Sequence, residues 1–125
     1  MGYRSLWKTT GDQNTSIGSF SGSANTTGTE NVFVGRDAAK TNTTGSYNTA
    51  VGSDSLYSNT TASYNTAVGY QAGYSNTTGS TNTTVGYQAG YTNTTGANNT
   101  FVGRLAGYNS TGGSNTFIGN NAGYT

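Results

Sequence analysis

The chain has 125 residues and a formal net charge of +1, and hydrophobic residues make up 30% of it while charged residues make up 7%. The apolar share lies well below the roughly 45–50% of ordinary globular domains, which argues against a conventional two-layer core. The few basic residues are scattered, and no apolar run has the length of a signal peptide or a membrane span, so we expect no nucleic-acid partner and no membrane insertion.

A repeat of seventeen residues accounts for nearly the whole chain. After a partial coil in residues 1–13, each coil begins with an asparagine, and the step is seventeen residues except before the last coil, where it is sixteen. We place the missing residue directly after Tyr108. A fixed period of this kind is the signature of a repeat architecture, so residues 1–125 are expected to form a single β-solenoid domain. The coils start at Asn14, Asn31, Asn48, Asn65, Asn82, Asn99 and Asn115.

The first residues of each coil predict a short strand that ends at a glycine corner. A β-branched residue at the fourth position suits a pleated, half-buried surface, and we expect this column to point inward as the core. It comprises Ile17, Val34, Val51, Val68, Val85, Val102 and Ile118. The glycine that follows suits a bend with positive φ or a close approach of two backbones. These corner glycines are Gly18, Gly35, Gly52, Gly69, Gly86, Gly103 and Gly119.

The asparagine at the first position is expected to form a ladder along the solenoid axis. Stacking of coils brings equivalent residues into one column, where each side-chain amide can bond to the asparagine above and below it. A ligand-binding role for the same seven asparagines is the alternative.

The second part of each coil predicts an extended piece and then a turn. The eighth position is always Ala or Ser, as expected where two walls of a narrow coil come close. An extended piece through the tenth position would carry Tyr57, Tyr74, Tyr91, Tyr108 and Tyr124, and Asn-Thr-Thr-Gly would return the chain to the next coil. With no helical apolar stripe and frequent Gly, Thr and Asn, the chain is predicted to be all-β, a parallel β-solenoid in which each coil advances about 4.7–4.9 Å.

Catalysis is not expected, and neither is a cofactor or a metal. The chain contains no histidine and no cysteine, which removes the common nucleophile–base pairs and the imidazole and thiolate ligands. Asp37 and Asp54 share the seventh position of adjacent coils, so stacking would place them about 5 Å apart, a spacing that resembles a glycosidase pair. We favour the alternative that Arg36 and Lys40 neutralise two exposed carboxylates.

Two columns are candidates for a binding surface. The tenth-position tyrosines can stack on a glycan or a partner, or can stack on one another and cover the core. The threonines after the turn asparagine form a hydroxyl column of the type found in ice-binding solenoids, at Thr26, Thr43, Thr60, Thr77 and Thr94. The asparagines before them each head an N-glycosylation sequon, at Asn25, Asn42, Asn59, Asn76 and Asn93.

Each coil carries little apolar surface, and this favours oligomers. Burial of one Val, one Ala and part of a Tyr per coil does not offset the backbone entropy of seventeen ordered residues, about 1–2 kcal/mol each. Additional burial is available at the third position, where Phe33, Phe101 and Phe117 alternate with smaller residues. Two interpretations stay open, namely that these rings pack between copies or that they lie inside the coil.

The stretch Asn-Thr-Ala-Val-Gly-Tyr-Gln-Ala-Gly-Tyr-Ser-Asn-Thr-Thr-Gly, from Asn65 to Gly79, resembles the repeats in the shafts of phage tail-fibre and bacterial surface proteins. Its Asn-x-Ala-Val-Gly core is also similar to the head repeats of trimeric autotransporter adhesins, although the adhesin repeat is shorter. The resemblance implies a left-handed β-roll, three chains packed side by side, and a location outside the cell or on a virion.

We therefore expect a structural segment of a fibre or adhesin that spaces and presents a receptor-binding region. The expected partners are other copies of the chain, as a trimer or stacked head to tail, and a cell-surface glycan or receptor. The alternatives are a self-assembling extracellular filament subunit and a solenoid that binds glycan or ice.

Overall fold

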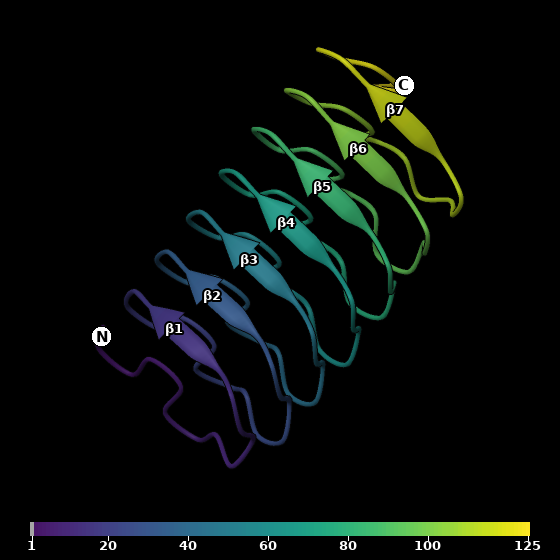
Figure 1. The fold of residues 1–125 in the computed structure, drawn as a ribbon. Coiled ribbons are helices and arrows are strands. Elements are labelled where there is room, and N and C mark those ends of the chain that lie inside the picture. The colour runs from purple at the N-terminus through teal and green to yellow at the C-terminus, as the bar shows by residue number, and fades with distance from the viewer. Residues whose placement is uncertain (1) are drawn as a thin grey trace.

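The computed structural model describes residues 2–125, and in this range the chain is all-β and forms one elongated parallel β-solenoid, with its two ends at opposite ends of the rod (Figure 1). Each coil contributes one three-residue strand to a single sheet, and the strands lie side by side in chain order. Their bounds are β1 Thr15–Ile17, β2 Val32–Val34, β3 Thr49–Val51, β4 Thr66–Val68, β5 Thr83–Val85, β6 Thr100–Val102 and β7 Thr116–Ile118.

The repeat length fixes the register of this sheet. Every neighbouring pair of strands is parallel, and each residue pairs with the residue at the same coil position, as Ala50 does with Ala67 and Val51 with Val68. Equivalent side chains therefore stand above one another along the axis. The predicted parallel solenoid of seventeen-residue coils is confirmed.

The rest of each coil contains no second strand in the part of the chain described, contrary to the extended piece predicted through the tenth position. The seventh and ninth residues lie in the left-handed region, with φ of 53° at Gln71 and 61° at Gly73, so the chain zigzags through tight turns. Hydrogen bonds still run along the axis, because Gly73 N–H donates to the carbonyl of Ala89 at 2.9 Å and Thr77 N–H to that of Thr94 at 2.8 Å. Every wall of the solenoid is thus bonded to the coils on either side.

The corner glycines end the strands as expected. Their φ values lie between 128° and 138°, a region that residues with a side chain rarely adopt. A Cβ built on Gly52 would lie 2.4 Å from the carbonyl oxygen of Gly69 in the next coil. Both the conformation and the stacking distance therefore require glycine at this corner.

The fourth-position column lies on the outside of the sheet, so its assignment to the core was wrong. Ile17 is 54% exposed, Val68 36% and Ile118 69%, and the other members, Val34, Val51, Val85 and Val102, are only half-buried. The physical reason is that side chains alternate between the two faces of a strand. The third residue points inward together with the first-position asparagine, and the fourth residue must then point outward.

The interior is filled from the third, eighth and ninth positions. Phe33 and Phe101 are completely buried, so these third-position rings pack inside the coil rather than between copies. Ala38, Ala72, Ala89 and Ala106 form a buried alanine column at the eighth position. The ninth position carries Leu56, which is 2% exposed, in one coil and glycine in most others.

The first-position asparagines form the ladder that we expected, with backbone amides taking part in it. The backbone N–H of Asn48 donates to Oδ1 of Asn31 at 2.9 Å, and that of Asn65 donates to Oδ1 of Asn48 at 3.0 Å. The Asn48 Nδ2 group donates to the carbonyl of Ala62 at 2.8 Å. Asn48 thereby joins the previous coil to the return turn of its own coil, whereas the Nδ2 group of Asn65 is buried without a hydrogen-bond partner.

A second asparagine ladder occupies the twelfth position, where the sequence had indicated only a turn. Asn42 Nδ2 donates to Oδ1 of Asn25 at 2.8 Å, and Asn59 Nδ2 donates to Oδ1 of Asn42 at 2.7 Å. All three side chains are 0% exposed. The amide nitrogens that head these sequons therefore point into the folded solenoid.

The step before the last coil is sixteen residues long, and the residue that it lacks is not missing directly after Tyr108, where we had placed it. Asn109 Nδ2 donates to the carbonyl of Tyr124, as the Thr92 hydroxyl donates to that of Tyr108, so Asn109 takes the eleventh position. Ser110 N–H bonds to the carbonyl of Gly107, as Asn93 N–H bonds to that of Gly90, so Ser110 replaces the ladder asparagine. The missing residue lies in the turn between Ser110 and Gly112.

Candidate functional site

The tenth-position tyrosines form one continuous stack along the rod. Successive ring centroids from Tyr57 to Tyr108 are each 5.1 Å apart, with interplanar angles of 14°, 9° and 5°, and Tyr124 extends the stack at 5.4 Å. This spacing follows from the advance of about 4.8 Å per coil, which suits offset-stacked rings. The rings cover the turn wall and keep one edge in solvent, so they both pack on one another and offer a surface.

Burial within this stack changes the ionisation of Tyr74. Partial burial, followed by the charges that neighbouring Tyr57 and Tyr91 would carry, raises the pKa of Tyr74 above its ordinary value of 10.0. The neutral phenol of Tyr74 is therefore favoured in the folded chain.

A second line of polar and aromatic groups runs beside the stack. Tyr70 and Tyr87 stack at 5.5 Å and are 43% and 47% exposed, and Gln88 Nε2 donates to Oε1 of Gln71 at 2.8 Å. These four residues come from the sixth and seventh positions of two adjacent coils. Together with Tyr74 they define the tyrosine face of the solenoid.

The two aspartates considered for catalysis are held in an ion-pair cluster. Arg36 contacts Asp37 with Nη1 at 2.8 Å and Asp54 with Nη2 at 3.2 Å, and Lys40 Nζ lies 2.9 Å from Asp37. Asp37 and Asp54 are 6% and 7% exposed, so they are buried rather than exposed as we had expected. The two carboxylates are balanced by the Arg36 guanidinium and the Lys40 ammonium together, which supports a structural role.

Four of the five threonines in the hydroxyl column, Thr26, Thr43, Thr60 and Thr77, donate their hydroxyl protons to backbone carbonyls of the next coil. Thr43 Oγ1 donates to the backbone carbonyl of Thr60 at 3.0 Å, and Thr60 Oγ1 donates to that of Thr77 at 3.1 Å. The hydroxyl protons are thus used between coils, and they reinforce the axial bonding of the turn wall.

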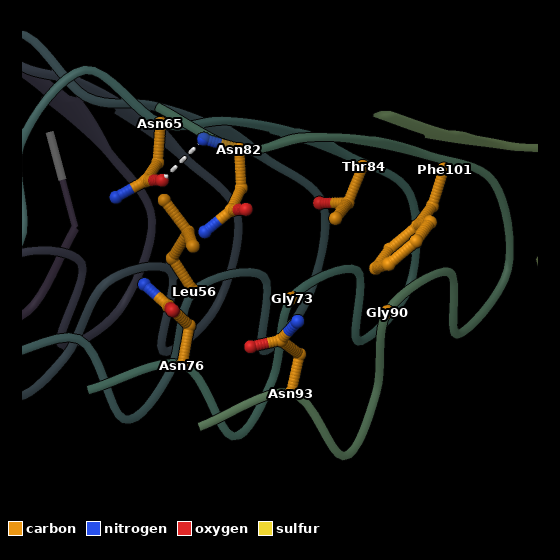
Figure 2. Close-up of a pocket in the computed structure, with 9 residues that line it drawn as sticks. All are labelled: Leu56, Asn65, Gly73, Asn76, Asn82, Thr84, Gly90, Asn93 and Phe101. Atoms are coloured by element: carbon orange, nitrogen blue, oxygen red, sulfur yellow. Dashed lines mark hydrogen bonds between the residues drawn. The ribbon is translucent and has the colours of Figure 1, made fainter. Parts of the chain in front are cut away.

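A small cavity lies inside the solenoid near Thr84, and Figure 2 shows the side chains around it. Its volume is about 10 Å³, which is room for one water-sized sphere. Leu56, Gly73, Gly90 and Phe101 form most of the apolar lining. This cavity is far too small for a metabolite, so it is not a ligand site.

Within residues 2–125 there is no group of three or more acidic, histidine or cysteine side chains arranged to hold a metal ion. The same residues include no helix long and apolar enough to cross a membrane.

The fold and these surfaces define the chain as a parallel β-solenoid with one narrow sheet and an aromatic stack. Comparison with protein-family models, with curated proteins and with solved structures finds no match.

Proposed function

We propose that the chain is a structural segment of a fibre or surface adhesin, in which three copies pack side by side through the outer face of the sheet. The observation that carries this proposal is the fourth-position column, whose members are exposed or half-buried on the outer face of the sheet. It places a β-branched side chain in every coil from Ile17 to Ile118 on one narrow face. Exposed apolar surface that is continuous in this way is typical of an interaction site.

A second copy of the chain is the best partner for this column, because the axial spacing of the partner's side chains must match that of the fourth-position residues. Parallel copies carry the same residues at the same axial steps, so one coil faces one coil along the whole rod. Closed rotational symmetry buries the column of every copy equally. The mechanical role then follows from the axial hydrogen bonds of both asparagine ladders, which resist bending and extension.

The tyrosine face lies on a different part of the coil and stays accessible in such an assembly. Aromatic rings with polar edges suit contacts with glycans or with protein side chains. In this proposal the rod spaces and presents these contacts at a virion or cell surface, and no catalytic step is involved.

The proposal is tested by measuring the mass of the native assembly for the wild type and for Val68→Asp. We expect a trimer for the wild type and a folded monomer for the variant, because Val68 faces outward and a carboxylate there opposes its equivalents in the other copies. Gln71→Asp is the matched control, because it places the same charge on the tyrosine face and should leave the trimer intact. A wild type that is monomeric at every concentration would refute the proposed assembly.

A further inference from the structure

The tyrosine stack is interrupted toward the N-terminal end of the rod. Leu6 N–H bonds to the carbonyl of Ser21 as Gly73 N–H bonds to that of Ala89, so Trp7 takes the tenth position of the partial coil. The tenth-position column therefore reads Trp7, Ser23, Lys40 and then Tyr57. A ring is missing at Ser23, between an indole on one side and an ammonium group on the other.

An open groove of about 300 Å³ occupies the place of that missing ring. Its ends are Trp7, which is 64% exposed, and Lys40, and Phe20, Ser23 and Ala24 line it between them. Trp7 and Lys40 are two coil steps apart, about 10 Å, which leaves room for one planar ring at stacking distance from each. The volume lies at the lower end of the range for small-molecule sites, about 300–1,000 Å³.

The groove is strongly cationic. Arg4, Lys8 and Lys40 line it and no carboxylate does, although the chain has only 5 basic residues in total. The Arg4 guanidinium lies 5.4 Å from the ring centroid of Trp7. Asp37 is the nearby acid that contacts one of these cations, and it is shared between Lys40 and Arg36. A negative charge on the ligand would therefore be attracted.

The ammonium of Lys40 distinguishes an aromatic ligand from a sugar. It lies 5.0 Å from the ring centroid of Phe20 and 5.5 Å from that of Tyr57, so it already interacts with two π faces. A cation is attracted to the negative face of an aromatic ring, whereas a pyranose presents C–H groups and offers no such attraction.

We propose that this groove binds an aromatic ring that carries an anionic group, with the ring stacked between Trp7 and Lys40 and the anion directed to Arg4 and Lys8. The ligand completes the column where the sequence has Ser23 in place of an aromatic residue. The inference is independent of the proposed fibre role, because both walls of the groove come from coils of the same chain.

The test uses phenyl phosphate as the probe, with calorimetry for affinity and the fluorescence of Trp7, the chain's 1 tryptophan, as the local reporter. Benzyl alcohol supplies the ring without charge, inorganic phosphate supplies the charge without a ring, and glucuronate supplies an acidic sugar. We expect saturable binding of phenyl phosphate, about tenfold or more tighter than that of each of the other three compounds.

Variants locate the site. Ser23→Tyr places a ring of the chain itself in the groove and should abolish phenyl phosphate binding in a protein that remains folded. Ser75→Tyr, which adds a ring in a distant coil, should bind as the wild type does. Lys8→Gln should weaken phenyl phosphate binding about threefold to tenfold, while Arg104→Gln should not change it.

The proposal is overturned if Ser23→Tyr binds phenyl phosphate as well as the wild type does, since the groove is then not the site. Equal binding of inorganic phosphate would reduce the groove to a general anion patch. Equal binding of glucuronate would contradict the argument that Lys40 selects an aromatic ring.

Discussion

Gly73 faces Thr84 across the interior, where a Cβ on Gly73 would lie 3.2 Å from the Thr84 Oγ1 atom. Other layers combine a ninth-position glycine with a third-position phenylalanine, as Gly90 does with Phe101. In the preceding coil Leu56 supplies the volume and Ala67 is small. In the Gly73 layer the third position carries only Thr84, although the end of Leu56 reaches in from the preceding coil, and the interior cavity lies between them (Figure 2).

Thr84→Phe is therefore expected to stabilise the solenoid by about 1 kcal/mol, within the usual range for filling a cavity. The variant also removes a buried hydroxyl whose bond to the carbonyl of Thr66 is long, at 3.4 Å. Ala67→Phe is the matched control and should destabilise by about 1–3 kcal/mol, because Leu56 already occupies its layer. Urea unfolding of both variants gives the comparison, and shifts of the same sign would contradict this account of interior packing.

The sequence alone was sufficient to predict the columns. A strict period aligns equivalent residues once the coils stack, and the pairing of Ala50 with Ala67 follows from counting. It also indicated the corner glycine, since glycine is the only residue found at the fifth position.

The direction of each column was harder to predict, because a strand of three residues is too short to show its alternation. Asn65 and Val68 stand three positions apart, so on one strand they cannot both face inward. The asparagine takes the inner face, where its Oδ1 accepts the backbone N–H of Asn82 at 2.9 Å, while Val68 on the outer face is 36% exposed. The asparagine ladder thus determines which strand positions face inward, whereas hydrophobicity alone had led us to place the fourth position inside.

The groove beside Trp7 could not be predicted from the sequence for a different reason. Residues 1–13 have lost one position relative to a full coil, and assigning Trp7 to the tenth position required the backbone hydrogen bond from Leu6 to Ser21. The missing aromatic ring at Ser23 is recognised only when the partial coil has been aligned with the full coils.

The second asparagine ladder leads to a prediction for Asn59→Asp. Asn59 is fully buried, donates from Nδ2 to Asn42 Oδ1 and to the Ala62 carbonyl, and accepts from Asn76 Nδ2. An aspartate cannot donate when ionised and would face two acceptor oxygens, so we expect a loss on the order of 3 kcal/mol at neutral pH.

Acidification should restore part of that loss. The carboxyl of the variant is expected to have a raised pKa in the folded state, so its protonated form, which can donate, becomes favoured in the folded chain at a pH above the unfolded value of about 4, and the recovery is complete below that value. Thermal unfolding of Asn59→Asp across this range should show a deficit that narrows as the pH falls. Asn120→Asp, at an exposed position, should show no such pH dependence.

Alkaline pH should weaken the fold through three groups. The pKa values of Lys40 and Tyr74 are raised, the first by its bond to Asp37 and the second by burial in the stack, and the carboxylate of Glu30 raises that of Tyr47. A raised pKa in the folded state means that the unfolded chain loses its proton first. The stabilisation from these groups is fully present below pH about 10 and is lost above it.

The measurement is the melting temperature between about pH 8 and 12, together with tyrosinate absorbance. We expect a plateau followed by a decline that begins near the ordinary pKa of tyrosine. Tyr74→Phe keeps the stacked ring and should make the decline shallower. A melting temperature that is constant over the whole interval would show that the ionisation of these groups is not linked to folding.

Gly69→Ala should be among the most damaging small substitutions in the chain. Gly69 has φ of 133°, and a Cβ there would lie 2.5 Å from the carbonyl oxygen of Gly86 and 2.8 Å from its carbonyl carbon. Strain at such a φ costs about 1–3 kcal/mol before the clash is counted, and the neighbouring backbone is held by the sheet and cannot easily move. Gly112→Ala is the control, because a Cβ there would meet nothing closer than the Asn115 Nδ2 atom, at 3.5 Å, and Gly112 does not have a positive φ. Thermal melts should therefore show a much larger loss for Gly69→Ala, and equal losses would mean that the corner glycines are not required by the close stacking of the coils.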